Sequence, residues 1–211
     1  MGRVVGPLIC LAWLWMTVAV AAEPADILRE WTSIRAPQPP MLVPVEVDPA
    51  NTALLVISFD RNVCNTAMRA RCPAAIPKVK HLLDAARAHH MLIVHGYPAA
   101  ETPDTTVPEL VPFPDEPIVH AAADMFLNSG LDALLKDKGI TNVIVSGTSG
   151  NGAVLFSVVG GATKGFNLIV PADTMPADSA YLEQFSIFEL ADQDILNAHV
   201  KLTRSDLVGF H

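Results

Sequence analysis

Short, continuous apolar segments constrain the fold of this chain more than any other feature of its sequence. The first of them, residues 53–59, reads ALLVISF and contains no charged side chain. A strand that is apolar on both faces is buried on both faces, as in a parallel sheet covered by helices. The composition allows such a core, because 51% of the 211 residues are hydrophobic and 17% are charged.

Strand and helix patterns alternate along the rest of the chain. Further apolar segments of strand length follow at residues 91–95, 118–120, 142–146, 167–170 and 199–203. Helices are predicted between them at residues 77–90, 131–138, 153–164 and 178–191. This alternation predicts an α/β fold, a three-layer αβα sandwich with a mainly parallel six-stranded sheet.

Ligands of such sheets bind at the carboxyl ends of the strands. Polar groups gather at those predicted ends: Ser58, Asp60, His95, His120 and a glycine-rich turn at residues 147–153. The charge balance limits the classes of partner that the protein can bind. The chain has 14 Lys and Arg against 22 Asp and Glu, which gives a formal net charge of -8. Nucleic acid and anionic membrane surfaces require clustered cations, so neither is an expected partner. A small-molecule ligand at the strand ends is expected instead.

The first residues have the pattern of a secretory signal. Arg3 precedes an apolar stretch at residues 4–20, which ends in an Ala-Val-Ala cleavage pattern. We therefore expect a signal peptide over residues 1–21 and a periplasmic or secreted mature protein. A membrane anchor is the alternative, since the stretch is about long enough to span a bilayer, although a Gly-Pro pair interrupts it. After cleavage we expect no stable membrane insertion.

Residues 22–51 are predicted to form a Pro-rich arm, and residues 52–211 a single domain. Prolines between residues 37 and 44 remove backbone donors and favour extended structure. In another interpretation the arm reaches a neighbouring subunit, so that assembly into a homo-oligomer is left open.

Cys64 and Cys72 are the two thiols that remain after signal cleavage. In an oxidising compartment, two cysteines so close in sequence are predicted to form a disulfide. A redox-active or nucleophilic thiol is the alternative interpretation of the pair.

Three segments of the chain together resemble the isochorismatase-like hydrolases, also called the cysteine hydrolase superfamily. They read ALLVISFDRNV from residue 53, HAAADMF from residue 120 and GTSGNGAV from residue 147. An Asp-Thr pair at residues 173–174 follows at the family's Asp-small position. The resemblance implies the family's fold and an oxyanion pocket with an unusual peptide geometry at the third segment.

The resemblance also implies where the catalytic groups would lie. Family members use an Asp, a Lys and a nucleophilic Cys, and the matching positions here are Ser58, His120 and Ala153. A methyl group cannot attack a carbonyl, so a degenerate site is predicted in a non-catalytic protein that binds a small ligand or a partner. The candidate ligand-binding residues are Ser58, Asp124, Ser149, Gly150, Asn151 and Ala153.

An alternative hypothesis keeps hydrolysis without a cysteine. Asp60 could orient His120 and keep it basic, so that the imidazole activates water against a small amide, ester or enol ether. In a third interpretation, both side chains merely cap loops and fill a vestigial pocket.

No catalytic metal and no cofactor are expected. Nicotinamidases of the resembled superfamily carry an Asp-x-His motif, and residues 94–98 read VHGYP instead. His89 and His90 are adjacent at a helix end, where they cannot easily face one ion, and are predicted to be exposed.

Overall fold

The computed structural model describes residue 2 and residues 26–98 and 101–211. It divides into two compact units, Met1–Pro37 and Gln38–His211. In the first unit, Asp26 caps the short helix α1 (Ile27–Glu30) by accepting a hydrogen bond from the backbone N–H of Leu28 at 3.0 Å. The predicted signal peptide lies outside the described residues, apart from Gly2.

The second unit is built on a six-stranded sheet in which every neighbouring pair of strands is parallel. Its strands are β2 (Thr52–Ile57), β3 (Leu92–Pro98), β4 (Ile118–Ala121), β5 (Asn142–Gly147), β6 (Asn167–Pro171) and β7 (Val200–Thr203). Their order in space is β4-β3-β2-β5-β6-β7, so the chain builds outward from β2 in both directions. The predicted α/β fold with a mainly parallel six-stranded sheet is confirmed.

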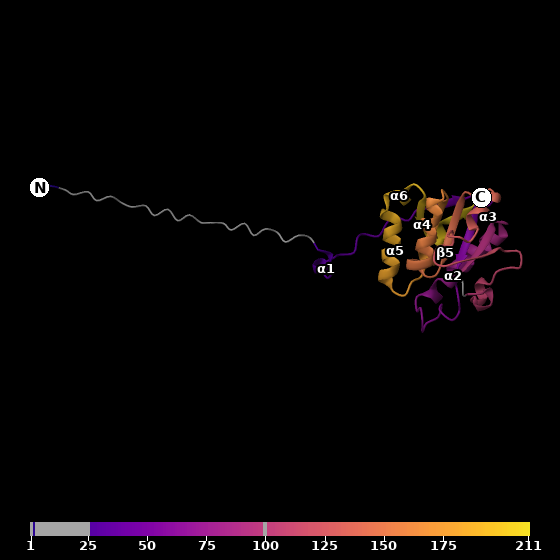
Figure 1. Ribbon diagram of the computed structural model, residues 1–211, viewed down its shortest axis with the longest axis horizontal. Helices are drawn as coiled ribbons and strands as arrows, with labels where there is room; N and C mark the ends of the chain where they lie inside the picture. The colour runs from indigo at the N-terminus through magenta and orange to yellow at the C-terminus, as the bar shows by residue number, and fades with distance from the viewer. Residues whose placement is uncertain (1, 3–25, 99–100) are drawn as a thin grey trace. The chain divides into compact units, whose positions relative to one another are not determined.

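Different layers cover the two faces of this sheet. Successive side chains of a strand point to opposite faces, and in β2 Leu54 and Val56 join one apolar cluster while Leu55 and Ile57 join another. The first cluster includes side chains of α2 (Ile76–Ala88), β1 (Val45–Val47) and β8 (Val208–Phe210). The second includes side chains of α3 (Leu131–Asp137), α4 (Leu155–Thr163), α5 (Ala180–Asp192) and α6 (Asp194–Asn197), all of which are labelled in Figure 1. No helix of the described ranges combines the length and apolar character needed to cross a membrane.

Three departures of the structure from the sequence-based elements bear on the fold and the site. β1 and β8 form a parallel two-stranded sheet that was not predicted, because each has three residues and the partners lie far apart in sequence. β3 continues to Pro98 instead of ending at His95. The helix predicted from residue 153 begins as a π-helical turn, Gly150–Val154, before α4 starts.

His95 lies inside β3, not at the end of its strand as the sequence suggested. It pairs in register with Val56, and its side chain is 2% exposed. Its Nε2 atom lies 2.8 Å from Oε2 of Glu116, and Nε of Arg87 lies 2.8 Å from Oε1 of the same carboxylate. The backbone N–H of Phe113 donates to Oε2 at 2.9 Å, and the Arg87 guanidinium lies 3.7 Å from the centre of the Phe113 ring. This network fastens the segment before β4 to α2 and β3.

The network predicts that acid destabilises the fold. Burial lowers the pKa of His95, against the raising effect of the Glu116 carboxylate. Desolvation would raise the pKa of Glu116, but hydrogen bonds from Arg87, the Phe113 N–H and His95 together lower it. In both cases the unfolded chain binds a proton more readily than the folded one, so stability falls as pH falls.

The loss of stability begins as the pH falls below 6.5, the ordinary pKa of His, because of His95. It continues below 4.5, the ordinary pKa of Glu, because of Glu116. Urea unfolding followed across this range tests the expectation, with His95→Gln as the comparison. The variant should lose less stability than the wild type in the first part of the range. Parallel profiles for the two proteins would contradict the assignment to His95.

Candidate functional site

The candidate site lies where the order of the strands reverses. β2 and β5 are neighbours at this point, Ile57 pairs with Gly147, and the backbone N–H of Thr148 donates to the Ile57 carbonyl at 3.0 Å. A Cβ atom on Gly147 would lie 2.6 Å from Cβ of Ile57, so only glycine allows this approach. Such a reversal is the usual ligand-binding position of an open α/β sheet.

The turn after β5 has the unusual peptide geometry that the resemblance implied. The Thr148–Ser149 peptide bond is cis, and the π-helical turn Gly150–Val154 follows it. The backbone N–H of Gly150 donates to the Pro176 carbonyl at 2.9 Å, and a Cβ on Gly150 would clash with the Met175 carbonyl oxygen. The glycines therefore let the turn pack closely against the segment after β6.

Ala153, at the position of the family's cysteine, is packed among apolar side chains. It is 9% exposed and belongs to the same cluster as Ile57, Ala121 and Met125. Both cysteines in the described part of the chain, Cys64 and Cys72, are buried and bonded to each other as a disulfide, with Cα atoms 5.1 Å apart. Within the described residues, no free thiol stands near the turn.

A carboxylate that sequence reasoning missed lies at Ser58. Ser58 follows β2 in a left-handed conformation, with φ of 48°, and its hydroxyl donates to Oε2 of Glu101 at 2.5 Å. The contact joins residues 43 positions apart. Glu101 stands in the long acidic, Pro-rich segment after β3, and nothing in that segment's sequence distinguishes it from the other acids.

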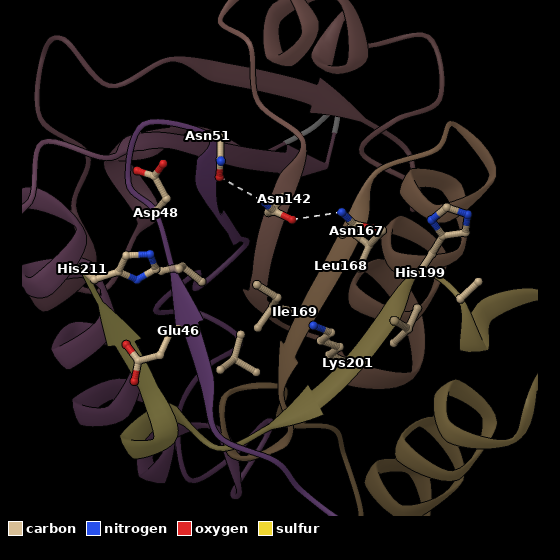
Figure 2. A pocket seen from close by; sticks show the side chains of 14 residues that line it. Glu46, Asp48, Asn51, Asn142, Asn167, Leu168, Ile169, His199, Lys201 and His211 are labelled. Atoms are coloured by element: carbon tan, nitrogen blue, oxygen red, sulfur yellow. Dashed lines mark hydrogen bonds between the residues drawn. The ribbon is translucent and has the colours of Figure 1, made fainter.

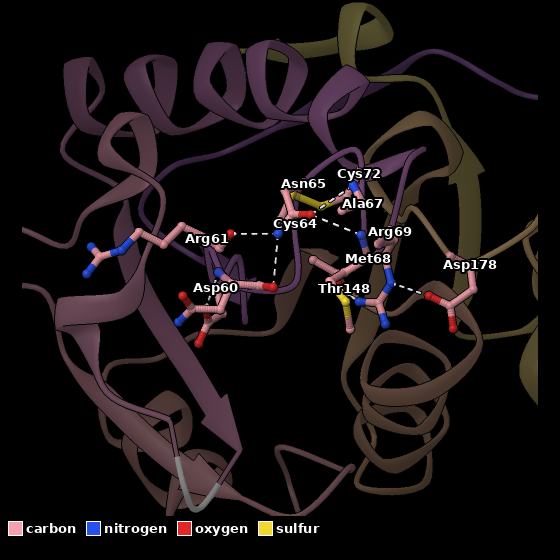
Figure 3. The surroundings of a disulfide bond; sticks show 12 residues. Asp60, Arg61, Cys64, Asn65, Ala67, Met68, Arg69, Cys72, Thr148 and Asp178 are labelled. Atoms are coloured by element: carbon pink, nitrogen blue, oxygen red, sulfur yellow. Dashed lines mark hydrogen bonds and ion pairs between the residues drawn. A yellow bond between two sulfur atoms is a disulfide. The ribbon is translucent and has the colours of Figure 1, made fainter.

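A cation that was also missed lies at Thr148. Arg69 comes from the loop closed by the disulfide, and its Nη1 donates to Oγ1 of Thr148 while its Nε donates to Oδ1 of Asp178 at 2.7 Å (Figure 3). Its side chain is only 14% exposed. Next to it, Arg71 forms two hydrogen bonds with Glu183 of α5 at 2.7 and 2.6 Å. The loop is thus tied both to the turn and to α5.

Asp60 and His120 are not brought into direct contact. Asp60 is 7% exposed, and its Oδ1 accepts the backbone N–H of Asn62 at 2.6 Å. His120 is exposed on β4, with its ring centre 6.0 Å from that of Tyr97. The Tyr97 hydroxyl lies 2.8 Å from Oγ1 of Thr106, which forms a β-bridge with Asp60. No hydrogen bond between Asp60 and His120 is found in the described ranges.

Of the other predicted ligand-binding residues, Ser149, Gly150 and Asn151 belong to the turn after β5, whereas Asp124 packs against α4. Oδ1 of Asn151 is buried in the turn and has no hydrogen-bond partner, and a Cβ on Gly152 would lie 2.6 Å from Oγ of Ser149. Asp124 instead lies against Gly160 within α4 and accepts the backbone N–H of Phe126 at 2.8 Å. Burial raises the pKa of Asp124.

Metal ligation has no candidate cluster in the part of the chain that the structure describes. No group of three or more His, Cys, Asp or Glu side chains is arranged to hold an ion there.

A separate cavity of about 450 Å³ opens at the opposite, amino edge of the sheet (Figure 2). An amide ladder borders it, in which Nδ2 of Asn142 donates to Asn51 at 2.9 Å and Nδ2 of Asn167 donates to Asn142 at 3.0 Å. Lys201 and His199 line the other side. This cavity contains none of the residues that the sequence singled out as a site.

Comparison with known proteins agrees with the architecture. A cysteine hydrolase from Pseudomonas syringae pv. phaseolicola 1448A matches with a TM-score of 0.68 and 19% identity over 80% of this chain and 95% of that one. An isochorismatase from Pseudomonas putida KT2440 matches with a TM-score of 0.67 and 18% identity over 88% and 99%. N-carbamoylsarcosine amidase from Thermoplasma acidophilum matches with a TM-score of 0.61 and 15% identity over 74% and 97%. Similarity at these identities shows the fold.

The family assignment follows from the sequence comparison. No curated protein matches the chain, but the family model described as the isochorismatase domain matches residues 52–200. This match covers well over half of the chain and includes all three segments that carry the resemblance. The protein therefore belongs to the isochorismatase family.

Proposed function

We propose that this protein is an exported member of the isochorismatase family that binds a small ligand at the carboxyl edge of its sheet without hydrolysing it. Ala153 carries the proposal, because the position that would hold the nucleophile bears a methyl group packed into the core. Covalent catalysis by the family's route requires a thiolate there. The two described cysteines are joined in a disulfide elsewhere, so neither offers a substitute thiolate.

The surrounding charges support a binding site. The carboxylate of Glu101 accepts a hydrogen bond from Ser58, the residue at the family's Asp position. The guanidinium of Arg69 donates a hydrogen bond to Thr148 of the turn. Both residues lie outside the three segments that carry the family resemblance. The site thus has a carboxylate and a cation to orient a ligand but lacks the atom that would attack it.

Water-mediated hydrolysis by Asp60 and His120 is the second candidate function. It is favoured by a series of contacts, in which the Asp60 backbone forms a bridge with Thr106, Thr106 bonds Tyr97 and the Tyr97 ring lies near His120, and by the exposure of His120 to solvent. A carboxylate and an imidazole in one region can share the activation of a water molecule.

Both candidates are tested by measuring hydrolysis of small amides, esters and enol ethers by the purified protein and its Asp60→Ala and His120→Ala variants. We expect no turnover above the buffer rate for any of the three proteins. Turnover that disappears in both variants, while circular dichroism shows that they remain folded, would overturn the binding proposal in favour of hydrolysis.

Export is part of the same proposal. A disulfide in a small closed loop suits an oxidising compartment, and the first residues of the chain match a secretory signal. N-terminal sequencing of the protein recovered from a periplasmic or culture fraction should begin after residue 21 of the chain. Recovery of the uncleaved protein from the cytoplasm would contradict export.

A further inference from the structure

We infer that the cavity at the amino edge of the sheet is a binding site for a neutral disaccharide. It lies at the opposite edge from the site of the proposed function, and the inference does not depend on that function. The cavity has a volume of about 450 Å³, within the roughly 300–1,000 Å³ that is typical of small-molecule sites. Figure 2 shows the side chains that line it.

Polar side chains line this cavity from neighbouring strands of the sheet. Asn142 of β5 pairs in register with Asn167 of β6. The next residue of β6, Leu168, donates its backbone N–H to the carbonyl of His199 at 2.6 Å, so His199 extends the arrangement toward β7. Side chains two positions apart in a strand share a face, so Asn167 lies on the face of Ile169. Ile169 belongs to the apolar cluster of β1 and β8, which therefore cover the same face.

Hydrogen bonds give the carboxamides of this amide ladder one direction. Nδ2 of Asn142 donates to Oδ1 of Asn51 at 2.9 Å, and Nδ2 of Asn167 donates to Oδ1 of Asn142 at 3.0 Å. Both links run the same way, so Nδ2 of Asn51 and Oδ1 of Asn167 have no hydrogen-bond partner among the described residues. The ladder therefore offers a ligand a donor at one end and an acceptor at the other.

His199 adds an imidazole at the acceptor end of the ladder. Its Nδ1 atom is buried and has no hydrogen-bond partner in the described part of the chain. A buried polar atom without a partner costs free energy. The ring lines the cavity, so a turn about its Cβ–Cγ bond would bring this atom to a ligand hydroxyl. A hydroxyl suits either protonation state of the nitrogen, because it both donates and accepts.

The charges around the cavity disfavour an ionic ligand. Figure 2 shows Glu46 and Asp48 on one side and Lys201 on the other, and all three residues are exposed. An anion would meet the two carboxylates as well as the ammonium group, and a cation would meet the ammonium group as well as the carboxylates. Hydroxyl groups tolerate both, because they donate to carboxylates and accept from ammonium and amide N–H groups.

The length of the ladder favours two linked sugar rings over one. β2, β5 and β6 are consecutive neighbours in the sheet. Neighbouring strands lie about 4.8 Å apart, so Asn51, which precedes β2, and Asn167 of β6 are separated by roughly 10 Å. A single sugar ring is shorter than this distance, whereas two linked rings reach it. Val45, Val47 and Ile169 line the same cavity and offer apolar surface to the C–H groups of the rings.

The test measures binding of maltose, cellobiose, lactose, sucrose and trehalose to the purified disulfide-bonded protein by calorimetry. Glucose is the probe with a single ring, and inorganic phosphate and putrescine are the ionic probes. We expect at least one disaccharide to bind at millimolar concentration or below, and to bind more tightly than glucose and either ion.

Variants locate the bound sugar. Asn167→Ala and His199→Ala should each weaken binding of the preferred disaccharide by about 2- to 10-fold, the range of one lost hydrogen bond between neutral groups. His81→Ala, at an exposed position of α2, is the matched control and should bind as the wild type does. Glu101→Gln, at the opposite edge of the sheet, reports binding at the other site. Circular dichroism and thermal unfolding confirm that each variant is folded.

Three results would overturn the inference. The first is the absence of measurable binding of every disaccharide at millimolar concentration. The second is tighter binding of glucose, phosphate or putrescine than of every disaccharide. The third is disaccharide binding that Asn167→Ala and His199→Ala leave unchanged, or that Glu101→Gln abolishes, because the sugar would then occupy another site.

Discussion

Glu116→Ala is expected to lower the free energy of unfolding by about 3–5 kcal/mol, the cost of breaking a buried ion pair. The Glu116 side chain is 8% exposed, and it bonds Arg87, His95 and the backbone N–H of Phe113. Removing it leaves a mostly buried guanidinium and a buried imidazole without their common acceptor. Equilibrium urea unfolding of the variant and the wild type at neutral pH measures the difference.

An exposed ion pair on the same helix provides the control. Lys80 and Asp84 pair one turn apart on α2, with side chains that are 45% and 53% exposed. Asp84→Ala should cost less than about 0.5 kcal/mol, because solvent screens such pairs. If the two variants lose similar amounts of stability, burial of the Glu116 network does not have the role assigned to it.

The double variant Cys64→Ser, Cys72→Ser is expected to lose about 2–3 kcal/mol of stability, the chain-entropy estimate for a disulfide that closes so short a loop. The two cysteines are eight residues apart, and both are buried. Urea unfolding with and without a reductant tests this. The wild type should move to the stability of the variant when reduced, and the variant should not respond.

The same variant has a second consequence at the site. Arg69 lies within the loop that the disulfide closes, so opening the loop should weaken the contact between Arg69 and Thr148 (Figure 3). Backbone hydrogen exchange of residues 65–71 should then be faster in the variant than in the wild type. Unchanged exchange in these residues of the folded variant would show that the loop holds Arg69 in place without the disulfide.

The strands of the central sheet could be predicted because their signal is local. A segment such as residues 53–59 is apolar at every position, and only burial on both faces satisfies such a segment. The position of the candidate site stays a prediction, which rests on the general rule that ligands bind at the edge where the carboxyl ends of parallel strands meet. β1 and β8 escaped prediction, because three-residue strands are stabilised by a partner that lies far away in the sequence.

The charged groups of the site could not be predicted in the same way. Asp60 follows β2 and His120 lies in β4, with β3 between these two strands, and their side chains are directed to Asn62 and toward Tyr97. Glu101 and Arg69 occupy irregular segments, where the direction of a side chain depends on contacts with distant residues and not on a local period.

The sequence by itself determined the α/β sheet, the edge at which a site is expected and the absence of a thiol at residue 153, because residue identity and local hydrophobic period suffice for each. Only the tertiary structure decided which charges reach that edge. Ser58 meets Glu101 across 43 residues and Thr148 meets Arg69 across 79, and such contacts form only when the packed strands bring their loops together.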